Sequence, residues 1–326
     1  MSTQESTTTV DITTVDTSTA APVRRRAYWH TAGSLAVVLA AGFLAHRHWP
    51  VLESGMARLA VADRGWLLSG AAATLLTWGC SALAQQGAVA EPLPGRRLVA
   101  VQFAASAANH VLPAGVGAGA VNVRFLMRCG IPAARAATAL AVKAAASALV
   151  RGVLIAALAL TCPGVLQVPR IPPAGPAALL AVAVVVALLL RSPLGPRCRG
   201  AFAAVRADIR RVHARPARAA ALWGGSLAFA LLHAVVLIAV TQAIALPLPP
   251  ARVALLYLAA SSAAALLPTP GGLGSLDAVL ALALTAAGTP AGAAATAVLG
   301  YRILTVWLPL IPGLLVLGWL VRRRAL

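Results

Sequence analysis

The chain has 326 residues, of which 60% are hydrophobic and only 11% are charged, and its mean hydropathy is +0.84. A soluble domain of this size needs many more charged side chains to cover its surface, so the composition excludes an ordinary soluble protein. The formal net charge of +19 is also compatible with nucleic-acid binding. However, the basic residues lie between apolar runs, where they match the positive-inside rule and attraction to anionic lipid headgroups. The sequence therefore predicts an integral membrane protein with no nucleic-acid partner.

In chain order, residues 1–23 are rich in Ser and Thr, so we expect a disordered cytoplasmic tail. Residues 24–326 are predicted to form a single integral membrane domain. Its full transmembrane helices, about six in number, are expected at 31–49, 66–89, 133–160, 176–190, 219–246 and 291–320. A basic cytoplasmic loop is expected at about 191–218.

Four shorter apolar runs, at 98–112, 116–129, 251–267 and 273–287, flank two breaks in the helical pattern. Fifteen helical residues rise only about 22 Å, which is less than the roughly 30 Å of the hydrocarbon core. We therefore expect each pair of short helices to form a re-entrant hairpin. The alternative, in which every short helix crosses the membrane, leaves the loops on the same sides, so the charge pattern does not distinguish the two.

The two breaks belong to a repeated segment. AASAANHVLPAG (104–115) resembles AASSAAALLPTP (259–270), with Pro113 opposite Pro268, and further on Gly130 falls opposite Gly288. Repeat one is expected at about 98–160 and repeat two at about 251–320. If the most basic loops are cytoplasmic, both chain termini are cytoplasmic and the two copies face opposite ways. The predicted fold is an all-α polytopic membrane protein with an inverted repeat and two opposed re-entrant hairpins.

The breaks are candidate binding elements because they interrupt helices at membrane depth. Their residues are Pro113, Gly115, Pro268, Gly271 and Gly272. Irregular backbone survives there only inside protein or beside a wet cavity, and helices that restart after a break aim their positive N-termini at it. We expect the two tips to meet around a polar cavity. The alternative is that the prolines merely kink ordinary spans.

Three cations lie inside predicted spans: Lys143, Arg151 and Arg302. Lys143, Ser147 and Arg151 follow one another at four-residue intervals and so share neighbouring faces of one helix. A charge at mid-membrane costs at least about 2.5–3.5 kcal/mol, so these cations need water, a partner or an anionic ligand. A structural ion pair between Arg302 and Asp277 is the alternative to substrate binding.

Further candidates are Asn109, Arg124 and Asp277. Asp277 is the only acid in an apolar segment; it is expected to offset a helix dipole with Ser275 as N-cap, to pair with Arg302, or to take up protons. Asn109 precedes the first break by one turn and could bind freed backbone or a headgroup. Arg124 lies on a basic helix face near the cytoplasmic opening, where an interfacial anchor is the alternative.

The patterns required for catalysis are missing from the sequence. No two carboxylates share a predicted span, no nucleophile and base stand out, and no metal-ligand spacing occurs. The sequence therefore predicts neither an enzyme nor a cofactor, and it does not indicate an oligomeric state.

The run LLPTPGGLGSLDAVLALALTAAG (266–288) followed by YRILTVWLPLIPG (301–313) resembles the C-terminal signature of the flippase-like family. This family is also called the lysylphosphatidylglycerol synthase transmembrane region. Asn109, Pro113 and Gly115, then Arg124 and Gly130, resemble its N-terminal signature. The resemblance covers about residues 24–324. The chain departs from the family at Asp277, where Glu is usual, and at Ala118, where Glu often follows the glycine.

This resemblance implies lipid translocation or handling, with aminoacylated phosphatidylglycerol as the best-known cargo. The aminoacyl-transferase domain of some members has no counterpart here, so a separate enzyme is expected to make any modified lipid. The predicted function is a flippase that moves an anionic, aminoacylated or glycosylated lipid across the cytoplasmic membrane. The alternatives are a membrane enzyme acting on polyprenyl-phosphate-linked substrates and a non-transporting lipid-binding subunit.

Overall fold

The computed structural model describes residues 49–111, 117–161, 207, 210, 214–265 and 274–323, and within these residues it contains helices and no strand. Apart from Trp49, they belong to one compact unit, 50–326. The predicted disordered tail, the spans 31–48 and 176–190, and most of the basic loop 191–218 lie outside the described residues. The helices occur in chain order at α2 Trp49–Ala60, α3 Arg64–Gly87, α4 Gly95–Val111, α5 Gly117–Arg128, α6 Ala133–Thr161, α9 Pro216–Ala243, α10 Pro250–Ala265, α11 Ser275–Ala286, α12 Ala291–Arg302, the π-helical turn η5 Ile303–Trp307 and α13 Leu308–Arg322.

Four of these segments are long and apolar enough to cross a membrane: α3, α6, α9 and the continuous helix Ala291–Arg322. They confirm the spans predicted at 66–89, 133–160, 219–246 and 291–320. The four short runs are helices as well, namely α4, α5, α10 and α11. The sequence did not predict α2, a helix of 12 residues whose polar side chains Glu53 and Arg58 are exposed.

Proline and glycine set the ends of these helices. Pro216 occupies the first turn of α9 and Pro290 is the N-cap of α12, positions at which the missing N–H costs nothing. The π-helical turn precedes Pro309 and Pro312, two prolines in the first turns of α13. Neither proline can donate to a carbonyl four residues earlier, which explains why the helix widens there.

The central contact of the unit is between α3 and α9, which run in opposite directions. Small residues permit the close approach: a Cβ on Gly87 would lie 2.2 Å from the Leu222 nitrogen, and one on Gly225 would lie 2.6 Å from the Ala84 nitrogen. Helices in membranes associate in this way because packing, rather than the hydrophobic effect, holds them together.

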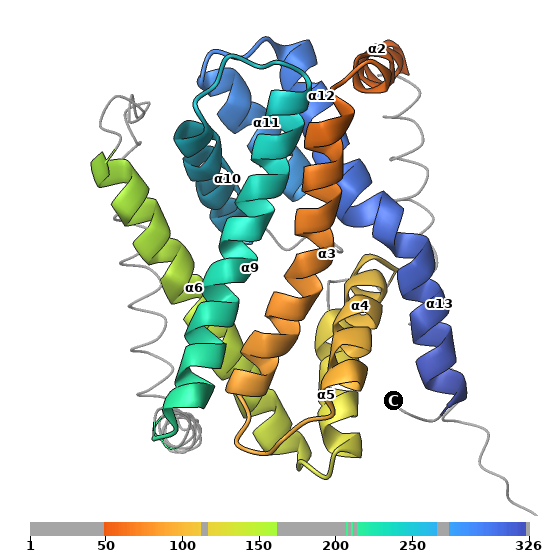
Figure 1. Ribbon diagram of the computed structural model, residues 1–326, viewed down its shortest axis with the longest axis vertical. Helices are drawn as coiled ribbons and strands as arrows, with labels where there is room; N and C mark the ends of the chain where they lie inside the picture. The colour runs from red at the N-terminus through yellow and green to blue at the C-terminus, as the bar shows by residue number, and fades with distance from the viewer. Residues whose placement is uncertain are drawn as a thin grey trace, which may run out of the picture. The chain divides into compact units, whose positions relative to one another are not determined.

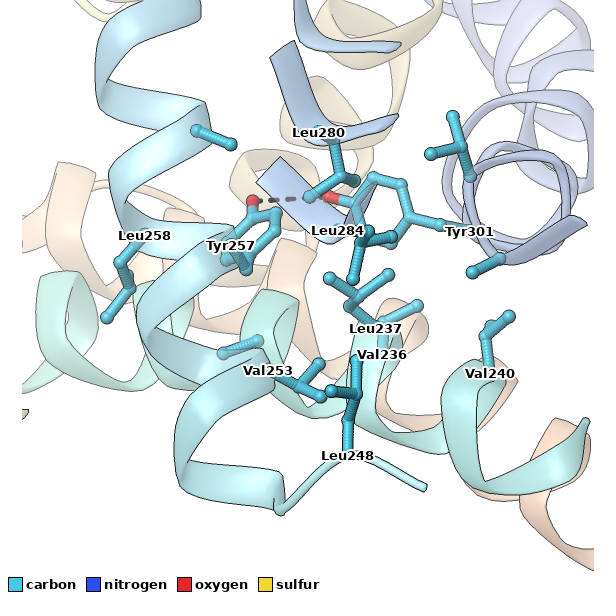
Figure 2. Packing of buried hydrophobic residues seen from close by; sticks show 14 of the residues in the cluster. Val236, Leu237, Val240, Leu248, Val253, Tyr257, Leu258, Leu280, Leu284 and Tyr301 are labelled. Atoms are coloured by element: carbon cyan, nitrogen blue, oxygen red, sulfur yellow. Dashed lines mark hydrogen bonds between the residues drawn. The ribbon is translucent and has the colours of Figure 1, made fainter. Parts of the chain in front are cut away.

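The two larger apolar cores of the described residues both include residues of α3. One joins α9 to α10, α11 and α12 through Leu237, Leu258, Leu280 and Tyr301 (Figure 2). The other joins α3, α4, α5, α6 and α13 and includes Phe125, a side chain that is 2% exposed. Each core is therefore built largely from one of the two repeated segments.

In Figure 1, α4 and α5 lie together in the lower half of the described unit, whereas α10 and α11 lie together in the upper half. A Cβ on Gly117 would lie 2.1 Å from the Ala108 carbonyl oxygen, so the backbones of α4 and α5 touch beside the first break. The residues that join α4 to α5 and α10 to α11 lie outside the described residues.

The loops that follow α5 and α11 have the same conformation. Gly130 has φ +85° and Gly288 has φ +92°, the left-handed region that favours glycine. The Ile131 N–H donates to Leu126 O and the Thr289 N–H donates to Leu284 O, both at 3.1 Å. Each is the six-to-one hydrogen bond of a Schellman cap, and the two caps occupy equivalent positions in the repeated sequence.

Candidate functional site

Two adjoining cavities are lined by residues of α3, α4, α5, α6, α9, α10, α11, α12 and η5. The lysine cavity, of about 240 Å³, contains Lys143 and is lined mainly by residues of the first half. The arginine cavity, of about 390 Å³, contains Arg151 and Arg302. Both are lined by Ser106, Asn109, His110, Phe229, His233 and Thr305. Because these residues are shared, we treat the two cavities as one central chamber.

Lys143 is held in the lysine cavity by neutral oxygen atoms. Its Nζ donates to Ser81 Oγ at 2.9 Å and to Gln102 Oε1 at 3.2 Å. Gln102 Nε2 in turn donates to Asn122 Oδ1 at 2.8 Å, and Asn122 Nδ2 donates to the Ala118 carbonyl. Within the described residues, Lys143 has no carboxylate within ion-pair distance. Its charge is therefore solvated by dipoles but not neutralised.

Arg151 lies on the same helix as Lys143 and lines the arginine cavity. The residue between them, Ser147, faces α9, where its Oγ is 3.4 Å from Ser226 Oγ. The four-residue spacing read from the sequence thus places all three residues on the side of α6 that meets the rest of the unit. In the described part of the chain, Arg151 makes no hydrogen bond or ion pair.

Arg302 forms an ion pair with Asp277, through Arg302 Nε and Asp277 Oδ1. The second carboxylate oxygen of Asp277 accepts a hydrogen bond of 3.0 Å from the Gly274 N–H. Asp277 therefore caps α11 and pairs with Arg302 at once. The expected N-cap was wrong: Gly274 takes that place with φ +86°, and Ser275 is the first helical residue.

A hydrogen-bonded row of aromatic side chains borders the arginine cavity. Tyr301 Oη donates to Tyr257 Oη at 3.1 Å, as Figure 2 shows, and His233 Nδ1 is 3.1 Å from Tyr301 Oη. These side chains come from α12, α10 and α9. His110 lines both cavities, and its buried Nδ1 has no partner in the described part of the chain.

The structure therefore brings together four of the candidates from the sequence: Asn109, Lys143, Arg151 and Arg302 all line the chamber. Asp277 is connected to the chamber through its ion pair with Arg302. Arg124 does not belong to this group, since it is exposed on α5 and lines neither cavity. The remaining candidates, Pro113, Gly115, Pro268, Gly271 and Gly272, lie outside the described residues.

Sequence reasoning did not select Gln102, Asn122, Tyr257 or Tyr301. For Gln102, Tyr257 and Tyr301, the repeat alignment contains a signal that could have found them. With Pro113 opposite Pro268, Gln102 falls opposite Tyr257, and with Gly130 opposite Gly288, Lys143 falls opposite Tyr301. The polar contacts Lys143–Gln102 and Tyr301–Tyr257 therefore occupy equivalent positions in the two halves.

These observations define a class of protein: an α-helical, multi-pass membrane protein whose interior holds a polar, cationic chamber. Residues 31–313 match the family model described as the lysylphosphatidylglycerol synthase TM region, and the chain belongs to this family. The match confirms the resemblance inferred from the motifs. A comparison with curated proteins gives no match.

Proposed function

We propose that the protein is a flippase, which moves an anionic or modified phospholipid across the cytoplasmic membrane and holds the headgroup in the central chamber. The observation that carries this proposal is the pair of cations Lys143 and Arg151, which line adjoining cavities without a carboxylate partner in the described residues. A phosphate group supplies the missing negative charge, and the guanidinium group of arginine matches it with two parallel hydrogen bonds.

In this proposal, α4–α5 and α10–α11 are re-entrant hairpins that enter from opposite sides of the membrane. Their helices have 17, 12, 16 and 12 residues, too few for each to cross a core of roughly 30 Å at 1.5 Å per residue. Their placement in opposite halves of the unit supports this arrangement (Figure 1). The equivalent caps after α5 and α11 support an inverted repeat.

We further propose that the lower end of the unit in Figure 1 is cytoplasmic. Helix ends that carry exposed arginines gather there: Arg124 and Arg128 on α5, Arg135 on α6, and Arg322 on α13. Cytoplasmic loops carry an excess of such residues. This orientation places the start of α9 and the end of α13 on the cytoplasmic side, in agreement with two cytoplasmic termini.

A flippase of this kind performs no covalent chemistry itself. Its partners are the bilayer, which supplies the lipid, and a separate lipid-modifying enzyme where the headgroup is modified. The apolar side chains Leu149, Val153 and Leu160 of α6 are exposed and would face the acyl chains. A lipid can then keep its acyl chains in the bilayer while its headgroup occupies the chamber.

The test is lipid translocation in proteoliposomes that contain a fluorescent anionic phospholipid, with an impermeant quencher outside. The wild type is expected to expose inner-leaflet lipid to the quencher, and Arg151→Gln is expected to abolish most of that rate. Arg322→Gln, which removes an exposed arginine at the end of α13, is the matched control and is expected to retain the rate. Equal rates for wild type and Arg151→Gln would refute the proposed site.

Arg302 is tested together with its partner, because Arg302→Gln alone leaves the Asp277 carboxylate without its counter-ion. The double variant Arg302→Gln/Asp277→Asn removes both charges at once. It is expected to slow translocation while the protein remains folded by size-exclusion chromatography.

A further inference from the structure

Resting on the function proposed above, we infer that the central chamber selects a phospholipid headgroup that combines a net negative charge with uncharged hydroxyl groups. A headgroup that carries aminoacyl ammonium groups is disfavoured. The chain would then transport an unmodified anionic lipid, such as phosphatidylglycerol, in preference to its lysylated form.

The positive charges around the chamber exceed the negative ones. Of the eight acidic residues in the chain, Asp277 is the only one in an apolar segment. Both of its oxygens are already engaged, one by Arg302 and the other by the Gly274 N–H. Lys143 and Arg151 therefore present positive charge that no acid of the described residues offsets. A ligand with net negative charge relieves this imbalance, and one with net positive charge increases it.

The spacing of the two cations also favours an anionic headgroup. Lys143 and Arg151 are eight residues apart on α6, which corresponds to about 12 Å along the helix axis. One phosphate group placed between them is therefore attracted electrostatically by both side chains. It can accept hydrogen bonds directly from Arg151. The wall shared by the two cavities is neutral at Ser106 and Asn109, so no carboxylate competes with the phosphate there.

The lining of the lysine cavity favours uncharged hydroxyl groups. Apart from Lys143 and the shared His110 and His233, its polar residues are uncharged hydroxyls and amides: Thr74, Thr77, Ser81, Gln102, Asn122 and Thr305 among them. Hydroxyls and amides both donate and accept hydrogen bonds, which suits the glycerol hydroxyls of a headgroup. The ammonium groups of a lysyl ester add positive charge, which no acid among the described residues of this cavity balances. Here they would instead meet the Lys143 ammonium, which already occupies the Ser81 and Gln102 oxygens.

The experiment is a competition between the two lipids on the purified full-length protein. Phosphatidylglycerol and lysylphosphatidylglycerol are added in equal amounts to the delipidated protein in detergent, and native mass spectrometry measures the lipid that is retained. The wild type is expected to retain phosphatidylglycerol over the lysyl lipid by at least about tenfold, the ratio that corresponds to 1.4 kcal/mol. Equal retention, or a preference for the lysyl lipid, would overturn the inference.

Variants of the two cations test whether the chamber determines the ratio of the two retained lipids. Arg151→Gln and Lys143→Gln are each expected to reduce the ratio at least about threefold, because each removes one of two like charges. Arg322→Gln is the control and should leave the ratio unchanged. An unchanged ratio in both chamber variants would overturn the inference. Should Lys143→Gln fail to fold, Arg151→Gln suffices, since the Arg151 side chain makes no hydrogen bond or ion pair in the described part of the chain.

Two further measurements distinguish a lipid site from a phosphate site, and lipid selectivity from lipid transport. Inorganic phosphate at millimolar concentration should displace little phosphatidylglycerol, and full displacement would identify a site for free phosphate rather than for a lipid. The translocation assay is then run with each lipid. Equal transport of both lipids overturns the selectivity while the flippase function stands. Selective retention without any transport overturns the flippase function while the selectivity stands.

Discussion

The ion pair between Arg302 and Asp277 is expected to be coupled energetically, even though Asp277 also caps a helix. The Arg302 side chain is 10% exposed and that of Asp277 is 33% exposed. Breaking a fully buried pair costs about 3–5 kcal/mol, whereas an exposed pair is worth only about 0.2–1 kcal/mol. With one partner a third exposed, the cost lies between these limits.

We therefore expect Arg302→Gln to lower the free energy of unfolding by about 2 kcal/mol, since it leaves a partly buried carboxylate that retains only the Gly274 N–H. Asp277→Asn is expected to cost about 2 kcal/mol as well, because it leaves the buried guanidinium group without its counter-ion. The double variant should cost only about 2–3 kcal/mol, which gives a coupling energy of about 1–2 kcal/mol.

The assay is equilibrium unfolding in mixed detergent micelles, followed by tryptophan fluorescence for the wild type, both single variants and the double variant. The exposed ion pair Arg135–Glu91, with side chains 44% and 39% exposed and a distance of 2.7 Å, provides the matched control cycle. Its coupling energy should stay below about 1 kcal/mol. A coupling energy for Arg302–Asp277 below about 0.3 kcal/mol, which means additive effects, would refute the reasoning.

The same unfolding assay tests the backbone features. Gly130→Ala and Gly288→Ala should each cost about 1–2 kcal/mol because both positions have positive φ. The two values should agree closely, since an added Cβ meets nothing within 4 Å at either site. Gly152 lies within α6, and a Cβ added there would meet nothing within 4 Å. Gly152→Ala should therefore stabilise the protein by up to about 1 kcal/mol. If Gly152→Ala destabilises the protein as much as Gly130→Ala and Gly288→Ala do, the loss of stability in those two variants does not arise from the positive φ. Gly87→Ala should cost about 3 kcal/mol, because its Cβ would lie 2.2 Å from the Leu222 nitrogen. A loss below 1 kcal/mol would contradict the close contact of α3 with α9.

Strong local signals in the sequence mark the four long helices that the structure describes and the side of α6 that carries Lys143 and Arg151. Long apolar runs specify α3, α6, α9 and the last helix, and a four-residue spacing places Lys143 and Arg151 on one side of α6. Gly130 and Gly288 begin the same loop in both copies because each supplies the left-handed conformation that ends a helix.

What the sequence did not reveal depends on contacts between distant segments. Gln102 and Lys143 are 41 positions apart, and each looks like an isolated polar residue in an apolar helix. Helix α2 was missed because it is short and amphipathic, and no long apolar run marks it. The N-cap of α11 was assigned to Ser275 by residue preference, but Gly274 adopts the positive φ that the turn requires.

The central claim is that the chamber between the two halves holds a lipid phosphate, and a structure determined in nanodiscs of phosphatidylglycerol tests it most directly. The account predicts density for a headgroup phosphate in contact with the Arg151 guanidinium group, between α6, α9 and α12. Density for phosphates only at the two surfaces of the bilayer, with a resolved chamber that contains none, would contradict it.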